Sequence, residues 1–230
     1  MNDLILPAVM SKIKSTYFCR NCGTSSPKWV GKCPSCNQWN TFAEEVVEKT
    51  KAQSAWKEEG RSSTKGPKKI SEIIYDTEQR FKIPGQELNR VLGGGIVAGS
   101  LILLGGEPGI GKSTLMLQTA LRLNKKVLYV SGEESENQVF MRAKRIGINN
   151  EECYLLSATE TSAIFKVIKE LKPELVIIDS IQTLFTKLIE ATPGSVSQIR
   201  ECAGEMLRFA KETDTPVVLI GHITKDGSIA

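Results

Sequence analysis

A glycine-rich segment sets the expected fold of this chain, and it reads Gly105-Gly106-Glu107-Pro108-Gly109-Ile110-Gly111-Lys112-Ser113-Thr114. From Gly106 it has the spacing G-x-x-x-x-G-K-S of a phosphate-binding loop, and it lies between an apolar run and a helical pattern, as that motif requires. The glycines let successive backbone N–H groups converge on an anion, and the N-terminus of the following helix adds partial positive charge. We therefore expect nucleotide binding here rather than a glycine-rich turn that binds nothing.

Two side chains of this segment have expected roles of their own. The Lys112 ammonium would reach the β- and γ-phosphates, and the Ser113 hydroxyl would hold Mg²⁺. The backbone of the segment, from Gly106 to Thr114, would surround the phosphates.

Outward from this segment, apolar patterns typical of strands alternate with helical patterns. Strands are predicted at 100–104, 127–130, 154–156, 175–179 and 216–220, and helices at 112–124, from 135, at 162–171 and from 195. Ser135 and Ser195 each have a glutamine three residues later, which is the pattern of a helix N-terminus. Continuous apolar strands alternating with helices predict an α/β fold, with a parallel sheet covered on both faces.

Polar residues at the ends of these strands are candidate site residues, because ligands of such a sheet lie beyond the carboxyl ends of its strands. Asp179 ends the most hydrophobic strand and could hold Mg²⁺ directly or through water. Either Glu133 or Glu134 could deprotonate the water that attacks the γ-phosphate, or both could simply favour a helix start. His222 ends the last strand, where it could sense the γ-phosphate or be structural.

Four of the six cysteines form two C-x-x-C pairs within eighteen residues: Cys19, Cys22, Cys33 and Cys36. This spacing predicts a structural Zn²⁺ site, whose closed set of four thiolates leaves no position for a catalytic water. The alternative, two disulfides, is disfavoured in a cytoplasmic chain. A module of about 30 residues is too small to bury a proper core, so the metal would supply its folding energy.

Two tryptophans of this module have open roles. Trp29 and Trp39 could stack on nucleic-acid bases, while Arg20, Lys28 and Lys32 contact phosphates. The alternative is that the tryptophans form the small core of the module. We expect one of them in that core and leave the other open.

Composition and charge limit the class of protein, its location and its partners. The 230 residues are 40% hydrophobic and 24% charged, as in a globular protein, and neither a membrane-spanning run nor a signal peptide is evident, which predicts a cytoplasmic location without membrane partners. The net charge of +4 arises within residues 1–80, which hold 13 Lys and Arg against 9 Asp and Glu. This modest basic excess permits contact with nucleic acid but does not demand it. The predicted division is an N-terminal extension (1–16), the zinc module (17–44), a polar, flexible linker (45–80) and the α/β core (81–230).

Seven segments of the sequence together resemble the bacterial RadA (Sms) family of DNA repair proteins. They are Cys19–Gly23, Pro27–Cys36, Leu92–Ser100, Gly105–Thr114, Tyr129–Ser135, Ile177–Thr183 and Gly221–Gly227. The resemblance runs from about Tyr17 to the last residue, apart from the linker. It implies a zinc finger followed by a RecA-like P-loop ATPase core, distantly similar also to KaiC and to DnaB-type helicases.

The resemblance also implies a function. In that family, ATP hydrolysis drives translocation on single-stranded DNA and branch migration of recombination intermediates, by a hexameric ring that works with the RecA recombinase. It would make Asp179 the Walker-B acid, Glu133 and Glu134 the catalytic pair, and 183–198 a loop that faces DNA in the channel of the ring. An alternative is an ATP-gated, KaiC-like signalling switch whose hydrolysis is incidental, and stimulation by DNA separates the two.

The C-terminus departs from the family pattern. The family continues past residue 230 with the rest of the RecA-like sheet and a Lon-protease-like domain that helps to form the ring. We therefore expect this chain to be a fragment or truncated product, with an incomplete ATPase core.

Overall fold

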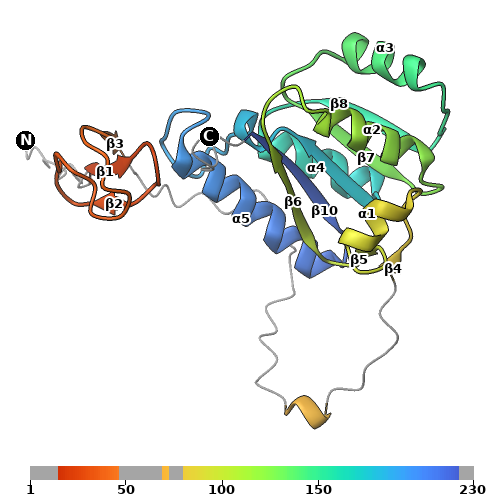
Figure 1. Ribbon diagram of the computed structural model, residues 1–230, viewed down its shortest axis with the longest axis horizontal. Coiled ribbons are helices and arrows are strands. Elements are labelled where there is room, and N and C mark those ends of the chain that lie inside the picture. Colours follow the sequence, from red (N-terminus) through yellow and green to blue (C-terminus); the bar gives the residue numbers. More distant parts are fainter. Residues whose placement is uncertain (1–14, 47–68, 73–79, 223–230) are drawn as a thin grey trace, which may run out of the picture.

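The computed structural model describes residues 15–46, 69–72 and 80–222, which form a small N-terminal sheet module and a larger α/β core (Figure 1). Between them, a single 3-10 turn is described at Ile70–Glu72. The predictions for most of the N-terminal extension, for most of the linker and for residues 223–230 lie outside the described residues.

The core is built on a five-stranded sheet in which every neighbouring pair is parallel. In spatial order its strands are β6 (Leu101–Gly106), β10 (Val217–His222), β9 (Leu175–Asp179), β7 (Val127–Ser131) and β8 (Cys153–Ser157). The predicted parallel sheet is confirmed, and the strands begin or end within two residues of the predicted bounds. All five carboxyl ends therefore meet at one edge of the sheet.

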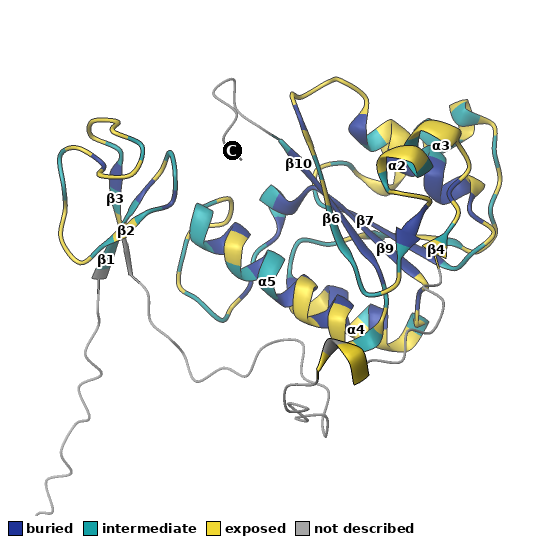
Figure 2. Cartoon of the chain, turned by 60° about the horizontal axis from the view of Figure 1, so that its bottom comes forward, coloured by how far each residue is buried: buried dark blue, intermediate teal, exposed yellow. Residues whose placement is uncertain are grey.

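Helices pack on both faces of this sheet (Figures 1 and 2). One face carries α2 (Lys112–Arg122) and α3 (Glu136–Ile146), and the other carries α4 (Thr161–Leu171) and α5 (Val196–Thr213). Side chains of the central strands alternate between the two faces, as strand geometry requires. Tyr129 and Ile177 pack toward α2, whereas their chain neighbours Val130 and Ile178 pack toward α4 and α5. Each fully buried aliphatic side chain contributes about 1.5–3 kcal/mol to this packing.

The covering of the sheet is less complete at β6 than predicted. This strand lies at one edge of the described sheet, and Leu103 is 48% exposed, whereas every residue of β7 and β9 is buried. Before β6 the chain forms a small antiparallel pair, β4 (Arg80–Phe81) with β5 (Ile96–Val97), around the short helix α1 (Gln86–Val91). Within the described ranges, no helix is long and apolar enough to cross a membrane.

The N-terminal module is an antiparallel sheet of β1 (Ser15–Cys19), β2 (Ser25–Ser26) and β3 (Phe42–Val46), in the order β2-β1-β3. We call residues 15–46 the ribbon. Its interior holds Cys19, Cys33 and Phe42, with other residues packed around them. Trp29 and Trp39 are 55% and 68% exposed, so the prediction that one of them forms this core is wrong. Phe42 and the cysteines already fill the small interior.

Candidate nucleotide and metal sites

The glycine-rich loop connects β6 to α2, as the sequence motif predicts. Gly109 and Gly111 have φ values of +82° and +96°, which side-chain-bearing residues rarely adopt, and a Cβ at either position would meet no atom within 4 Å. At Gly106 the constraint is contact instead, because a Cβ would lie 2.5 Å from Cδ1 of Ile110. The loop surface from Glu107 to Gly111 is exposed, as is Thr114 in the first turn of α2. Open space beside Gly109 and Gly111 fits close approach by a phosphate.

Lys112 lies folded over this loop and is only 6% exposed. Its Nζ donates hydrogen bonds to the carbonyl oxygens of Gly106 at 2.7 Å and Glu107 at 2.8 Å. The ammonium is therefore held against the loop at the N-terminus of α2. Backbone N–H groups, a helix N-terminus and a lysine form a donor set that fits a polyphosphate.

Asp179 lies at the carboxyl end of β9 and connects two hydroxyl groups. Its Oδ1 accepts a hydrogen bond from Ser113 Oγ at 3.1 Å, and its Oδ2 accepts one from the Tyr129 hydroxyl at 2.6 Å. Burial raises the pKa of Tyr129 far above its usual range, and the Asp179 carboxylate raises it further, so this hydroxyl stays a donor. The Ser113 hydroxyl beside the Asp179 carboxylate provides oxygen ligands of the kind that Mg²⁺ prefers.

Glu133 and His222 meet beside the end of β9. The Glu133 Oε1 accepts a hydrogen bond from Ser180 Oγ at 2.5 Å, and Nε2 of His222 lies 3.2 Å from the same oxygen. Gln182 Nε2 donates to the carbonyl oxygen of His222 at 3.0 Å, which ties β10 to the turn after β9. Ser180 directly follows Asp179 in the chain. Glu133, the predicted base, is therefore hydrogen-bonded to the residue next to the predicted metal ligand.

Glu134 is placed differently from Glu133. Its carboxylate forms an ion pair with Arg142 of α3, whose side chain is mostly buried. Its backbone is anchored by Ser131, whose Oγ accepts from the Glu134 N–H at 3.1 Å and donates to the Glu134 carbonyl at 2.8 Å. The two glutamates therefore have different partners, one at the strand ends and one on a helix.

Three of these partners were missed by sequence reasoning. Tyr129 is the one aromatic residue of β7, and Ser180 immediately follows the predicted Walker-B position, so both carried a weak signal. Arg142 carried none beyond its helical position.

The segment expected to face DNA needs a correction at its C-terminal end. Gln198 belongs to the first turn of α5 and is buried. Its Oε1 accepts from the Thr186 N–H at 2.9 Å, and its Nε2 donates to the Ala191 carbonyl at 2.9 Å. This side chain is therefore used to fold the loop after β9 and does not point outward to a ligand.

The four predicted metal ligands lie together in the ribbon. All four sulfur atoms are within 4.8 Å of one another, with Cys19 and Cys36 at 3.6 Å and Cys22 and Cys33 at 3.5 Å. A tetrahedral Zn²⁺ with Zn–S bonds of about 2.3 Å separates its sulfurs by about 3.8 Å, so the set fits zinc. All six cysteines of the chain are free in the structure, so the four sulfurs are arranged as a metal-binding set and not as two disulfides.

The thiol of Cys22 has a perturbed acidity. Burial raises its pKa, but hydrogen bonds from the hydroxyl and the backbone of Thr24 outweigh that effect and lower the pKa to about 6. A thiolate at neutral pH is the form that binds a metal.

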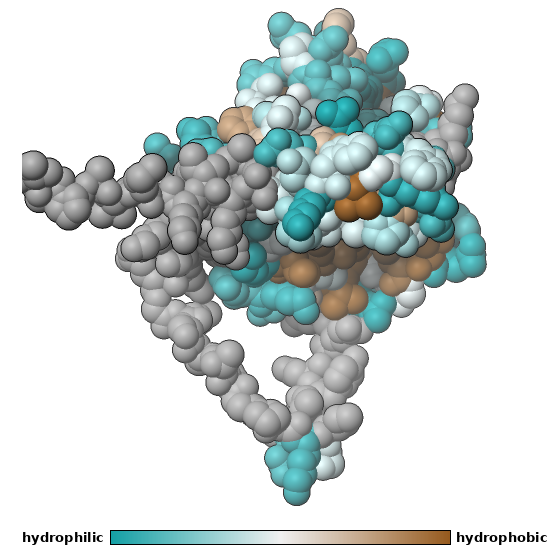
Figure 3. Space-filling view, turned by 90° about the vertical axis from the view of Figure 1, so that its left-hand side faces the viewer, coloured by the Kyte–Doolittle hydropathy of each residue, from teal (hydrophilic) through white to brown (hydrophobic). Residues whose placement is uncertain are grey.

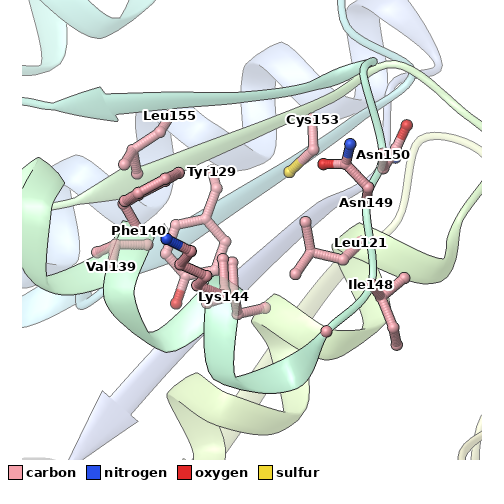
Figure 4. Close-up of a pocket in the computed structure, with 13 residues that line it drawn as sticks. Leu121, Tyr129, Val139, Phe140, Lys144, Ile148, Asn149, Asn150, Cys153 and Leu155 are labelled. Atoms are coloured by element: carbon pink, nitrogen blue, oxygen red, sulfur yellow. The ribbon is translucent and has the colours of Figure 1, made fainter.

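A separate cavity of about 490 Å³ lies between α2, α3 and β8 (Figure 4). Its walls are mostly apolar, with Leu121, Phe140 and Leu155 among them, and Lys144 is at its margin. Burial raises the pKa of Cys153, which also lines it, to about 11, so that thiol stays protonated. None of the predicted phosphate, magnesium or base residues contributes to this cavity.

Two family models match the chain. The model described as an AAA domain matches residues 68–228, and the one described as a rubredoxin metal binding domain matches residues 17–44. The fold is also similar to a solved structure of a KaiC-like protein from the hyperthermophilic archaeon Pyrococcus horikoshii. That comparison has a TM-score of 0.55 and 20% identity, and covers 66% of this chain and 74% of the other.

Curated relatives agree with these models. The chain is 48% identical over 226 residues to the DNA repair protein RadA of Bacillus subtilis, and 42% identical over 227 residues to that of Pseudomonas aeruginosa. Each alignment covers 96% of this chain and 49% of the relative, so the chain spans about half the length of the curated relatives it matches. A RecA-like parallel sheet, a phosphate-binding loop and a four-cysteine zinc ribbon thus occur in one chain with this similarity, and the chain belongs to the AAA domain family as a relative of the bacterial RadA proteins.

Proposed function

We propose that this chain carries the ATP-hydrolysing part of a DNA-stimulated motor that works in recombinational DNA repair. One observation carries the proposal: Ser113 and Glu133 both contact the end of β9, through Asp179 and Ser180 respectively. That arrangement joins the phosphate-binding loop to a carboxylate able to act as a base. The similarity to DNA repair proteins supports the choice of DNA as the effector.

In this proposal the residues divide the work of phosphoryl transfer to water. Lys112 and the loop backbone would hold the β- and γ-phosphates, and Ser113 and Asp179 would hold Mg²⁺, which would neutralise charge on the phosphate oxygens. Glu133 accepts the proton of the water that attacks the γ-phosphorus, while the bond to the leaving ADP oxygen breaks. His222 would register the γ-phosphate through its contact with Glu133. Glu134 is assigned a structural role, because it is already paired with Arg142.

The ribbon is the proposed contact with single-stranded or branched DNA. Its two exposed tryptophans lie beside each other, because a Cβ at Gly31 would be 3.6 Å from the Trp29 ring and 3.8 Å from the Trp39 ring. Lys32 Nζ lies 5.8 Å from the Trp39 ring centroid, and Lys28 is exposed nearby in sequence. Exposed indole rings with neighbouring cations are suited to stack on bases and contact phosphates.

The oligomeric state, the protein partner and the location are part of the same proposal. A homo-hexameric ring and cooperation with the RecA recombinase follow from the family resemblance, as does a place of work in the bacterial cytoplasm, where chromosomal DNA lies. We propose each for the longer protein of which the relatives are examples.

The test is ATP hydrolysis with and without single-stranded DNA, in the presence of zinc. We expect DNA to raise the rate, Lys112→Ala to abolish hydrolysis, and replacement of both ribbon tryptophans by alanine to remove the DNA effect while leaving the basal rate. The alternative, a nucleotide-gated switch, predicts a rate that ignores DNA. The same assay on a chain extended to the full length of the relatives decides between them, since continued indifference to DNA there would refute the motor.

A further inference from the structure

The ribbon and the core contact each other at the start of α5, where one arginine donates hydrogen bonds to the ribbon. Arg200 Nη1 donates a hydrogen bond to the carbonyl oxygen of Gly23 at 2.8 Å, and its Nη2 donates to the carbonyl of Cys22 at 3.3 Å. The paired positions are 177 and 178 residues apart in the chain. Figure 1 shows the ribbon beside the end of α5 from which this side chain comes.

The shapes of the two surfaces match closely at Gly23. This residue has a φ of +70°, and a Cβ added to it would lie 2.5 Å from Cγ1 of Val196 and 2.8 Å from Nη2 of Arg200. Glycine is therefore needed here both for the turn and for the close approach of the core. Next to this contact a cavity of about 410 Å³ separates the two parts, lined by Phe18–Arg20, Ala43 and Glu44 of the ribbon and by Thr192–Val196 of the core.

The contact combines hydrogen bonds from Arg200 with packing of Val196 against Gly23. Seen from the end of the molecule that carries the ribbon, the described outer surface is mainly hydrophilic, with most of the visible hydrophobic side chains in its lower part (Figure 3). Hydrogen bonds from a guanidinium to two carbonyls are stronger than neutral ones, and the geometry of both acceptors decides whether they form. The stability of the contact therefore depends on how the ribbon holds these two carbonyls.

The two carbonyls belong to the first metal-binding turn. Cys22 is one of the four sulfur ligands, and the turn is closed by hydrogen bonds from the Gly23 N–H to the Cys19 carbonyl at 2.7 Å and from the Cys19 N–H to the Thr24 carbonyl at 2.9 Å. A module this small has too little buried surface to keep such a turn without its metal. Metal binding would thus set the position of both acceptors for Arg200.

We propose that the first turns of α5, through Arg200 and Val196, are a docking surface for the zinc-loaded ribbon of the same chain. Loss of zinc disorders the Cys19–Thr24 turn and releases the ribbon from the core. Docking places the ribbon against the loop that follows β9, so that the exposed tryptophans and this loop move as one body. This interface does not require the ribbon to bind DNA.

The native tryptophans provide the test. The chain has three, Trp29, Trp39 and Trp56, so a Trp56→Phe background leaves both emitters in the ribbon. Time-resolved fluorescence anisotropy then reports whether the ribbon tumbles with the core or separately on the nanosecond timescale. In this background with zinc bound, we expect the anisotropy to decay slowly, at the rate at which the whole chain tumbles.

Arg200→Ala is the informative variant, because this exposed side chain is not needed to fold α5. We expect it to lower the ratio of docked to free ribbon about tenfold, as loss of hydrogen bonds from a charged group implies, and to add a fast decay component. Val196→Asp should act in the same direction. Arg208→Ala, on the same helix but paired with Glu201 at 3.2 Å, is the matched control and should leave the decay unchanged.

Removal of zinc with a chelator should produce the same fast component in the background chain, and restored zinc should reverse it. A decay that stays slow in Arg200→Ala, or after the metal is removed, would overturn the proposal. So would a slow component that disappears on dilution, because the ribbon would then be docked on a second copy.

Discussion

Replacing Glu133 or Glu134 by glutamine should separate catalysis from stability at two adjacent positions. Glutamine keeps an oxygen that can accept from Ser180 but cannot take a proton from water, so Glu133→Gln should lower kcat by about 10²–10⁴-fold, the usual contribution of a general base. ATP affinity should stay within about twofold, because Lys112 and Ser113 are unchanged. The melting temperature should also stay nearly constant, since the Glu133 side chain is 43% exposed.

Glu134→Gln should instead lower stability and leave kcat nearly unchanged. It removes the charge that faces Arg142, whose side chain is only 13% exposed, and a partly buried guanidinium without its counter-charge costs about 1–2 kcal/mol. For a chain of this size that is a fall of about 2–4 °C in melting temperature for each kcal/mol, with only a small change in kcat. Single-turnover hydrolysis and thermal unfolding of both variants are the assays. If Glu134→Gln loses hydrolysis while Glu133→Gln keeps it, the assignment of the base from these contacts is refuted.

Two further substitutions test the geometry around the phosphates, each against a matched control. Tyr129→Phe removes the donor to Asp179 Oδ2. We expect the free energy of unfolding to fall by about 1–3 kcal/mol and nucleotide binding to depend less on Mg²⁺. The control, Tyr154→Phe at an exposed position, should change neither. Gly111→Ala and Gly147→Ala place the same side chain at φ values of +96° and +71°, in both cases in open space. Each should therefore lower the free energy of unfolding by about 1–2 kcal/mol. Only Gly111→Ala should weaken ATP binding, measured by titration. Equal loss of affinity in the two alanine variants would assign the effect to general instability.

Much of the fold could be predicted from sequence because its signals are local. The glycine-rich loop, the apolar strands and the serine at the start of α3 each lie within a few residues of the structure that they specify. The Ser135 N–H indeed donates a hydrogen bond to its capping partner, the Gln138 Oε1, at 2.9 Å. Asp179 could be placed by the same logic, since the carboxyl ends of parallel strands share one edge. Contacts that follow from strand order can thus be predicted from the sequence alone.

Contacts that depend on side-chain direction could not be predicted. Glu133 and Glu134 are adjacent and chemically identical, and their different partners come from where the chain turns after β7, which has no periodic signal. The prediction that either Trp29 or Trp39 fills the core of the ribbon is wrong because Phe42 and the cysteines occupy that interior, although aromatic residues usually fill small cores. The Arg200 contact joins distant positions, and no pattern within the helix or the ribbon specifies it.

The segment that follows β9 connects the candidate nucleotide site to the ribbon. It begins with Asp179 and Ser180, which contact the phosphate-binding loop and Glu133, and Gln182 then holds the His222 backbone. It ends in α5, where Arg200 holds the ribbon. The contact with Glu133 and the contact with the ribbon therefore lie on one continuous segment of the chain. Gln198 ties the intervening loop to α5 by buried hydrogen bonds, so the two ends of this segment are linked by contacts between side chain and backbone as well as by the chain itself.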